Sequence, residues 1–111
     1  MGTLNQDARR STRLPLQVPV IVTTTLASAR DFRRECRTVV VNAHGCGVIV
    51  PELLENETRV LVKLVSNGSS KEGRVVLAIP LSENFSWLLG VEFESPGNFW
   101  EVENPPADWH A

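Results

Sequence analysis

The chain has 111 residues, of which 42% are hydrophobic and 22% are charged, so it is long enough for one folded domain and unlike a disordered chain. Its longest apolar stretches fall far short of the roughly 20 residues that cross a bilayer, and its polar first residues lack the apolar core of a secretory signal. The composition therefore excludes a helical membrane protein and predicts a single domain in the cytoplasm.

The formal net charge of −2 is divided unevenly along the chain. Residues 1–50 carry seven arginines and three acidic residues, whereas residues 51–111 carry four basic and ten acidic residues. The planar fork of an arginine suits phosphates and guanine edges better than the point charge of a lysine. We expect an anionic ligand near the N-terminal half, whereas an acidic domain is a poor binder of nucleic acid polymers.

Residues 1–14 show no hydrophobic period and are predicted to form a flexible arm in front of one domain over residues 15–111. Runs of β-branched residues separated by turn signals then predict six short strands. These strands cover residues 18–25, 36–41, 48–50, 59–65, 73–79 and 87–94. Pro19, which lacks an amide proton, indicates an edge position or an unpaired site in the first strand.

Alternation in the last strand predicts that one of its faces lies in the core. The residues of this face are Trp87, Leu89, Val91 and Phe93. Asn98 is predicted to cap a short helix over residues 99–103, which the two prolines that follow would end. Six short strands with frequent turns predict an all-β fold, a closed antiparallel barrel.

Two short motifs accompany these strands. Arg9 and Arg13 are four residues apart, with Arg10 between them, directly before the proline-framed first strand. The bend after the second strand reads N-A-H-G-C-G at residues 42–47, and the last strand contains L-G-V-E-F at residues 89–93. Each motif alone is common, but their order and the strands between them make the chain resemble the PilZ domain family.

Proteins of this family are receptors for cyclic di-GMP, and the resemblance implies a six-stranded antiparallel PilZ-type β-barrel with that function. It implies that Arg9 and Arg13 contact phosphates and guanine edges, and that Arg10 assists with a phosphate. Asn42 would hydrogen-bond a guanine edge, and Gly47 would let the backbone approach the ligand. Ligand binding would order the arm and so signal to an unidentified downstream protein in a bacterial second-messenger pathway.

His44 stands where the family has a serine, and we expect it to face the ligand, donating to a phosphate or stacking on guanine. Simpler roles are open for each motif. The arginines would be a solvated tail, and Asn42 and Gly47 would be turn residues, with His44 bonded to the backbone. A PilZ-like scaffold that has lost the nucleotide and acts as a protein-interaction module is the alternative function.

Other chemistry finds little support in the residues. Cys36, Cys46, His44 and His110 lack the paired spacing of a zinc site, so no metal or cofactor is predicted. The two cysteines lie in neighbouring predicted strands, and we expect free thiols in a reducing cytosol. Without paired carboxylates or an activated nucleophile, the chain is not predicted to be an enzyme. The tryptophans are expected to pack in the core and near the C-terminus.

Overall fold

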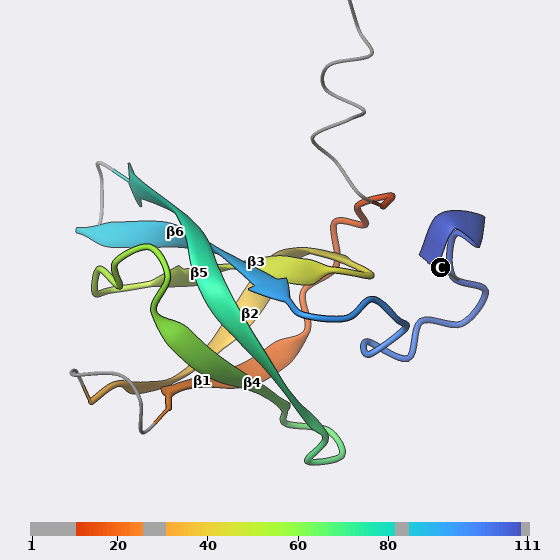
Figure 1. Cartoon of the computed structure of the whole chain (residues 1–111), viewed down its shortest axis with the longest axis horizontal. Coiled ribbons are helices and arrows are strands. Elements are labelled where there is room, and N and C mark those ends of the chain that lie inside the picture. The colour runs from red at the N-terminus through yellow and green to blue at the C-terminus, as the bar shows by residue number, and fades with distance from the viewer. Residues whose placement is uncertain (1–10, 26–30, 82–84, 110–111) are drawn as a thin grey trace, which may run out of the picture.

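The computed structural model of the chain describes residues 11–25, 31–81 and 85–109. Within these ranges, six antiparallel strands form a closed barrel with the neighbour order β1-β2-β3-β6-β5-β4 (Figure 1). The strands are β1 (Pro19–Thr24), β2 (Arg33–Asn42), β3 (Gly45–Val50), β4 (Arg59–Leu64), β5 (Ser70–Leu81) and β6 (Ser86–Phe93). The prediction of an all-β, six-stranded antiparallel barrel is confirmed.

Valine fills most of the barrel interior. Successive side chains of a regular strand point to opposite faces, so every second residue faces the core wherever the strand pairing is regular. The predicted inner face of the last strand is confirmed in β6, where Leu89, Val91 and Phe93 are buried and Trp87 is partly buried against the core. The apolar strand side chains with no exposed surface are Val20, Val22, Val41, Val48, Val60, Val62, Val75 and Leu89.

The first strand is not at an edge, because β1 pairs with β2 on one side and with β4 on the other. Pro19 is the first residue of β1, a position at which a strand tolerates a missing amide proton. Its carbonyl oxygen accepts a hydrogen bond from the Val65 amide at 3.2 Å. The pairing of β1 with β4 closes the barrel.

Two strands are interrupted by a β-bulge. The register shifts between Thr38 and Val40 in β2, and between Val75 and Leu77 in β5. A bulge places one extra residue on its strand and increases the local bend and twist. Both bulges lie on the side of the barrel where β2, β3, β6 and β5 are neighbours.

The predicted helix over residues 99–103 is wrong. Asn98 does not cap a helix but closes a loop, in which its Oδ1 accepts from the Val102 amide and its Nδ2 donates to the Val102 carbonyl, both at 3.0 Å. Glu101 and Asn104 each have a φ of 56°, outside the right-handed helical region. Helical backbone occurs instead after the prolines, in the 3-10 turn η1 (Ala107–Trp109). No helix of the described ranges has the length and apolar character needed to cross a membrane.

Candidate functional site on the outer face of the barrel

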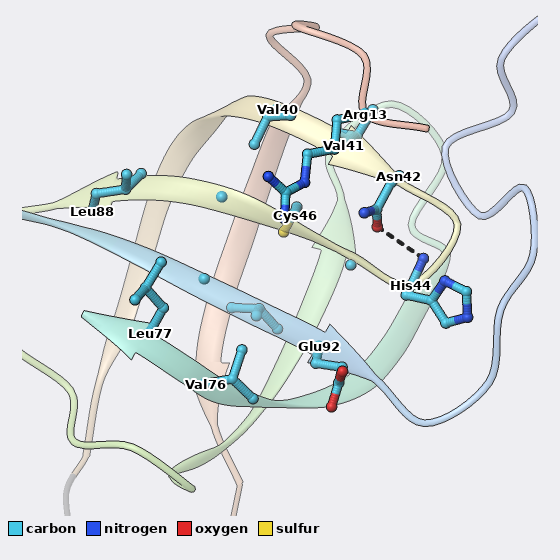
Figure 2. Close-up of a pocket in the computed structure, with 14 residues that line it drawn as sticks. Arg13, Val40, Val41, Asn42, His44, Cys46, Val76, Leu77, Leu88 and Glu92 are labelled. Carbon is cyan, nitrogen blue, oxygen red and sulfur yellow. Dashed lines mark hydrogen bonds between the residues drawn. The ribbon is translucent and has the colours of Figure 1, made fainter. Parts of the chain in front are cut away.

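A pocket of about 330 Å³ lies on the outer face of β2, β3, β6 and β5 (Figure 2). This volume is at the lower end of the range found for small-molecule sites. Its lining comes from four strands, from the turn between β2 and β3, and from the segment that precedes β1. The lining residues are Arg13, Val40, Val41, Asn42, His44, Gly45, Cys46, Gly47, Val76, Leu77, Leu88, Gly90, Val91 and Glu92.

The floor of the pocket is made of glycine backbone. Gly47 of β3 pairs directly with Gly90 of β6 at outward-facing positions, and Gly45 is the next outward residue of β3. A Cβ atom at Gly47 would lie 3.1 Å from Val40 Cγ1, and one at Gly90 would lie 3.1 Å from the Leu77 Cβ atom. We call Gly45, Gly47 and Gly90 the glycine floor. Any side chain on it would fill part of the pocket.

Gly45 has a second, structural reason to be glycine. A Cβ atom there would overlap the carbonyl oxygen of Val91, on the neighbouring strand. Since that overlap involves backbone atoms, no rotation of a side chain would relieve it. The bend between β2 and β3 therefore requires glycine at this position.

The walls of the pocket are apolar and come from the bulged strands. On β2, the methyl groups of Val39 and Val40 lie beside Gly47, as the distances from a Cβ atom built there indicate. On β5, the bulge turns both Val76 and Leu77 outward, and their exposed fractions are 39% and 47%. Bulges recur beside functional sites because they re-aim side chains in this way.

Asn42 and Glu92 lie on the rim of the pocket. Asn42 Oδ1 accepts a hydrogen bond from the His44 amide at 2.9 Å, which is the turn role considered for this residue. Its side-chain nitrogen points toward the pocket (Figure 2). Glu92 Oε1 accepts from Arg74 Nη2 at 2.8 Å. Arg74 also donates to Glu57, and these two hydrogen bonds, that to Glu57 first, raise the pKa of Arg74 above its ordinary value.

Arg13 reaches the pocket because the segment before β1 is attached to the end of β2. The backbone of Leu14 makes two hydrogen bonds with Val41, at 2.8 and 2.9 Å. Ser11 is buried, and its Oγ accepts from the Ala43 amide at 3.2 Å. The Arg13 side chain is exposed and extends over β3 (Figure 2).

Residues from the C-terminus hold the same segment in place. Asp108 Oδ2 accepts from both the amide and the hydroxyl of Thr12, at 2.9 and 2.8 Å. Trp109 Nε1 donates to the Thr12 carbonyl oxygen at 2.8 Å, and its side chain is buried. We call Thr12, Asp108 and Trp109 the terminal clasp. Because Thr12 directly precedes Arg13, the clasp fixes the backbone from which that arginine extends.

The loop after β6 supports the bend between β2 and β3. Trp100 Nε1 donates to the carbonyl oxygen of Asn42 at 2.9 Å, and the Gly97 amide donates to that of Ala43 at 3.1 Å. The Phe93 amide donates to the carbonyl oxygen of His44 at 2.7 Å. Three successive carbonyl groups of the bend are thus bonded, and its conformation is determined by residues about fifty positions away in the sequence.

The structure brings four of the six sequence-predicted site residues to one pocket: Arg13, Asn42, His44 and Gly47. The other two, Arg9 and Arg10, lie outside the described residues, as does most of the predicted arm. His44 Nδ1 lies 3.2 Å from Ser11 Oγ, and its ring points away from the glycine floor (Figure 2). His44 of the 42–47 bend is thus hydrogen-bonded to Ser11, in the segment before β1 that carries Arg13.

Sequence reasoning missed the contributions of β5 and β6 to the pocket, among them Leu77, Gly90 and Glu92. These residues reach it through the pairing of β3 with β6 and of β6 with β5. Gly90 and Glu92 belong to the L-G-V-E-F motif, in which the inward residues alternate with them. That alternation could have indicated these pocket residues from the sequence, because it places Gly90 and Glu92 on the same, outer face of the strand.

Both cysteine thiols are free and protonated at neutral pH. Burial, above all, raises the pKa of Cys36 from 9.0 to about 11, and burial also raises the pKa of Cys46. Cys46 borders the pocket, and its raised pKa favours the protonated thiol near neutral pH. No group of three His, Cys, Asp or Glu residues in the described part of the chain is arranged to hold a metal ion.

Comparison with known proteins assigns no family to the chain. No model of a protein family matches the sequence, and no curated protein matches it significantly.

Proposed function

We propose that the chain is a receptor of the PilZ type that binds cyclic di-GMP in the pocket on the outer face of the barrel. One observation carries this proposal: Arg13 and the 42–47 bend, which belong to separate motifs of the sequence, line the same pocket. The hydrogen bonds between Leu14 and Val41 hold the two motifs side by side. The combination of an exposed guanidinium, a side-chain amide and a bare backbone floor suits a planar, anionic ligand.

The chemistry of the ligand matches these groups. Cyclic di-GMP carries two phosphates and two guanines, and a guanidinium pairs in bidentate fashion with either a phosphate or the O6 and N7 atoms of guanine. In our proposal Arg13 makes this contact, and Arg9 and Arg10 add further positive charge. The Asn42 amide nitrogen donates to an acceptor on a guanine edge, and Gly47 allows the base to lie close to the backbone.

We further propose that His44 acts in place of the motif serine by bonding Ser11 and so positioning the arginine segment. Ligand binding gathers the arginines of the arm over the pocket. The resulting order is read by a downstream protein, and no chemical step is catalysed.

Calorimetric titration of the purified chain with cyclic di-GMP tests the proposal. We expect binding with a measurable heat, and Arg13→Ala weakens it at least about tenfold because a charged, bidentate contact is lost. Arg37→Ala is the matched control, since Arg37 is an exposed arginine of β2 that does not line the pocket. A folded wild-type chain that gives no heat at ligand concentrations on the order of tens of micromolar contradicts the proposal.

A second candidate function is a protein-interaction module that binds no nucleotide. It is favoured by apolar side chains on the same outer face: Ile49, Leu77 and Ile79 are each at least 40% exposed. Ile49 and Ile79 both pair with Leu88 of β6, so they form one apolar row across three strands. Capture of a protein partner that is unaffected by Arg13→Ala, by a chain that gives no heat with the nucleotide, supports this candidate.

A further inference from the structure

The outer face of β3, β6 and β5 is apolar at and beside the pocket. Two neighbouring rows of paired residues cross these three strands, and neither row contains a charged residue. The first row is Gly47, Gly90 and Leu77, and the second row is Ile49, Leu88 and Ile79. The exposed fractions of Ile49, Leu77 and Ile79 are 42%, 47% and 40%. A contiguous apolar face of this kind marks a surface that another molecule covers.

The outer face of β1 and β2 has the opposite character. Arg33, Glu35 and Arg37 alternate along β2 with residues that face the other way, and all three are exposed. Charged side chains of both signs keep such a face in water and hinder its association with other molecules. The face formed by β3, β6 and β5 has no such protection in its two apolar rows.

The two apolar rows differ in height. In the first row, Gly47 and Gly90 have no side chains, and they form the part of the glycine floor on which the pocket lies. In the second row, Ile49 and Leu88 project outward from the same two strands. Successive outward residues of a strand are about 6.8 Å apart. A ridge of two large side chains therefore lies directly beside a depression of the same width.

This pairing of ridge and depression makes the face complementary to itself. Consider a two-fold axis that runs between the two rows, parallel to them. It turns a second copy over and places each strand opposite its own counterpart. Ile49 of each copy then lies over Gly47 of the other, and Leu88 lies over Gly90 in the same way. Because both copies use the same surface, the contact is isologous and closes at two chains.

The rest of the face agrees with the same symmetry. Leu77 of each copy lies against Ile79 of the other, which adds an apolar contact on β5. Glu92 occupies the row beyond the floor, two residues from Gly90, and so it lies opposite Ser86 of the other copy rather than opposite a like charge. Like charges facing each other would oppose such an interface, and this arrangement avoids them.

We propose that the chain forms a two-fold symmetric dimer through this face, in which the Ile49–Leu88 ridge of each copy fills the glycine floor of the other. Three strands and four rows give a footprint of about 400 Å² per copy, half of the roughly 800 Å² of a standard interface. The dimer is therefore weak and reversible. The proposal does not rest on the proposed function, but a second copy and a ligand on the floor exclude each other.

Sedimentation velocity of the full chain between about 5 μM and about 1 mM tests the dimer, which we expect to dissociate with a constant on the order of 100 μM. Ile49→Glu should weaken it at least about tenfold, because a carboxylate from each copy would be buried on a floor without a partner. Ile49 does not line the pocket. Val65→Glu is the matched control, since Val65 is 46% exposed and follows β4, outside this face.

Isotope-filtered nuclear Overhauser spectra of a mixed labelled and unlabelled sample test the register. We expect contacts between the Ile49 methyl groups of one copy and the Gly47 α protons of the other. Thermal unfolding of each variant verifies that it is folded. A chain that stays monomeric at about 1 mM overturns the inference, as do a dimer that Ile49→Glu leaves unchanged and a dimer without these contacts.

Addition of cyclic di-GMP separates the inference from the proposed function. If both are correct, the nucleotide dissociates the dimer. A chain that forms the dimer but gives no heat with the nucleotide overturns the proposed function and leaves the inference standing. A monomeric chain that binds the nucleotide does the reverse. A dimer that binds the nucleotide and stays intact overturns the inference, because its floor cannot hold both.

Discussion

The inner and outer faces of the same two strands contrast sharply. Val48 of β3 and Leu89 of β6 are paired inside the barrel, and neither has exposed surface. Their chain neighbours Gly47 and Gly90 are paired on the outside and have no side chains at all. One residue separates a position that stabilises the fold from one that shapes the pocket. The alternation of a β-strand therefore lets the outer surface change while the core is kept.

Of the substitutions that compare the two faces, we expect the largest loss of stability from one on the inner face. Leu89→Ala removes a fully buried side chain, and we expect the free energy of unfolding to fall by about 2–5 kcal/mol, from lost burial plus a cavity. Urea unfolding monitored by tryptophan fluorescence measures this loss. A variant that still folds should keep the affinity for cyclic di-GMP that we propose, because Leu89 does not line the pocket.

Gly90→Ala is the control for Leu89→Ala. Its new Cβ atom meets Leu77 at 3.1 Å, while alanine reduces the backbone entropy of the unfolded chain, so we expect a change below about 1 kcal/mol. If this outer substitution destabilises the barrel as much as Leu89→Ala does, the two faces do not have separate roles.

A smaller effect is expected from the terminal clasp, which belongs to the outer side. Asp108→Ala removes two hydrogen bonds from Thr12, and because both residues are exposed we expect a loss of only about 1 kcal/mol. Hydrogen exchange gives the sharper readout, since the Thr12 amide should exchange much faster once its acceptor is gone. Unchanged protection of that amide would show that Asp108 does not hold the segment.

The smallest expected change in folding stability comes from the cysteines, and it appears only at alkaline pH. Burial raises the pKa of Cys36 to about 11 from 9.0, so the folded chain retains a thiol proton that the unfolded chain loses. This contribution to stability is complete below about pH 9 and is lost as the pH rises toward about 11. Cys46, whose pKa is also raised, acts in the same direction.

Urea midpoints between about pH 8 and about pH 11 test the alkaline effect. Desolvation lowers the pKa of Lys71, which acts in the opposite direction over the same range, so the comparison must be made with Cys36→Ala. The variant should lose less stability on going to high pH than the wild type. Parallel pH profiles for the two chains would contradict the assigned cause.

The strands could be predicted from the sequence because their signals are local. Runs of β-branched residues and alternation around Val91 specify strand and inner face without reference to the rest of the chain. The helix prediction failed for the same local reason: Asn98 followed by apolar residues looks like a helix start. In the structure, the side chain of Asn98 bonds Val102 instead, and Trp100 is buried with its ring nitrogen on the Asn42 carbonyl.

Four of the residues that line the pocket could be predicted, and most of the others reach it through contacts between distant residues. Arg13 and Asn42 belong to motifs that a reader can recognise in the sequence. Leu77 and Glu92 become pocket residues only through the pairing of β3 with β6 and of β6 with β5. The clasp between Thr12 and Asp108 joins residues 96 positions apart, for which no local pattern gives a signal.

The strand order has a consequence for how the protein is made. β3 pairs with β6, and β1 pairs with β4, although each pair is far apart in the sequence. Neither pairing can form until a long stretch of chain has been synthesised. Folds dominated by such non-local pairings assemble slowly, over about milliseconds to seconds. A nascent chain halted before residue 86 would have the arginine segment and the bend but no β6 beneath them. Formation of the pocket and completion of folding should therefore coincide during synthesis.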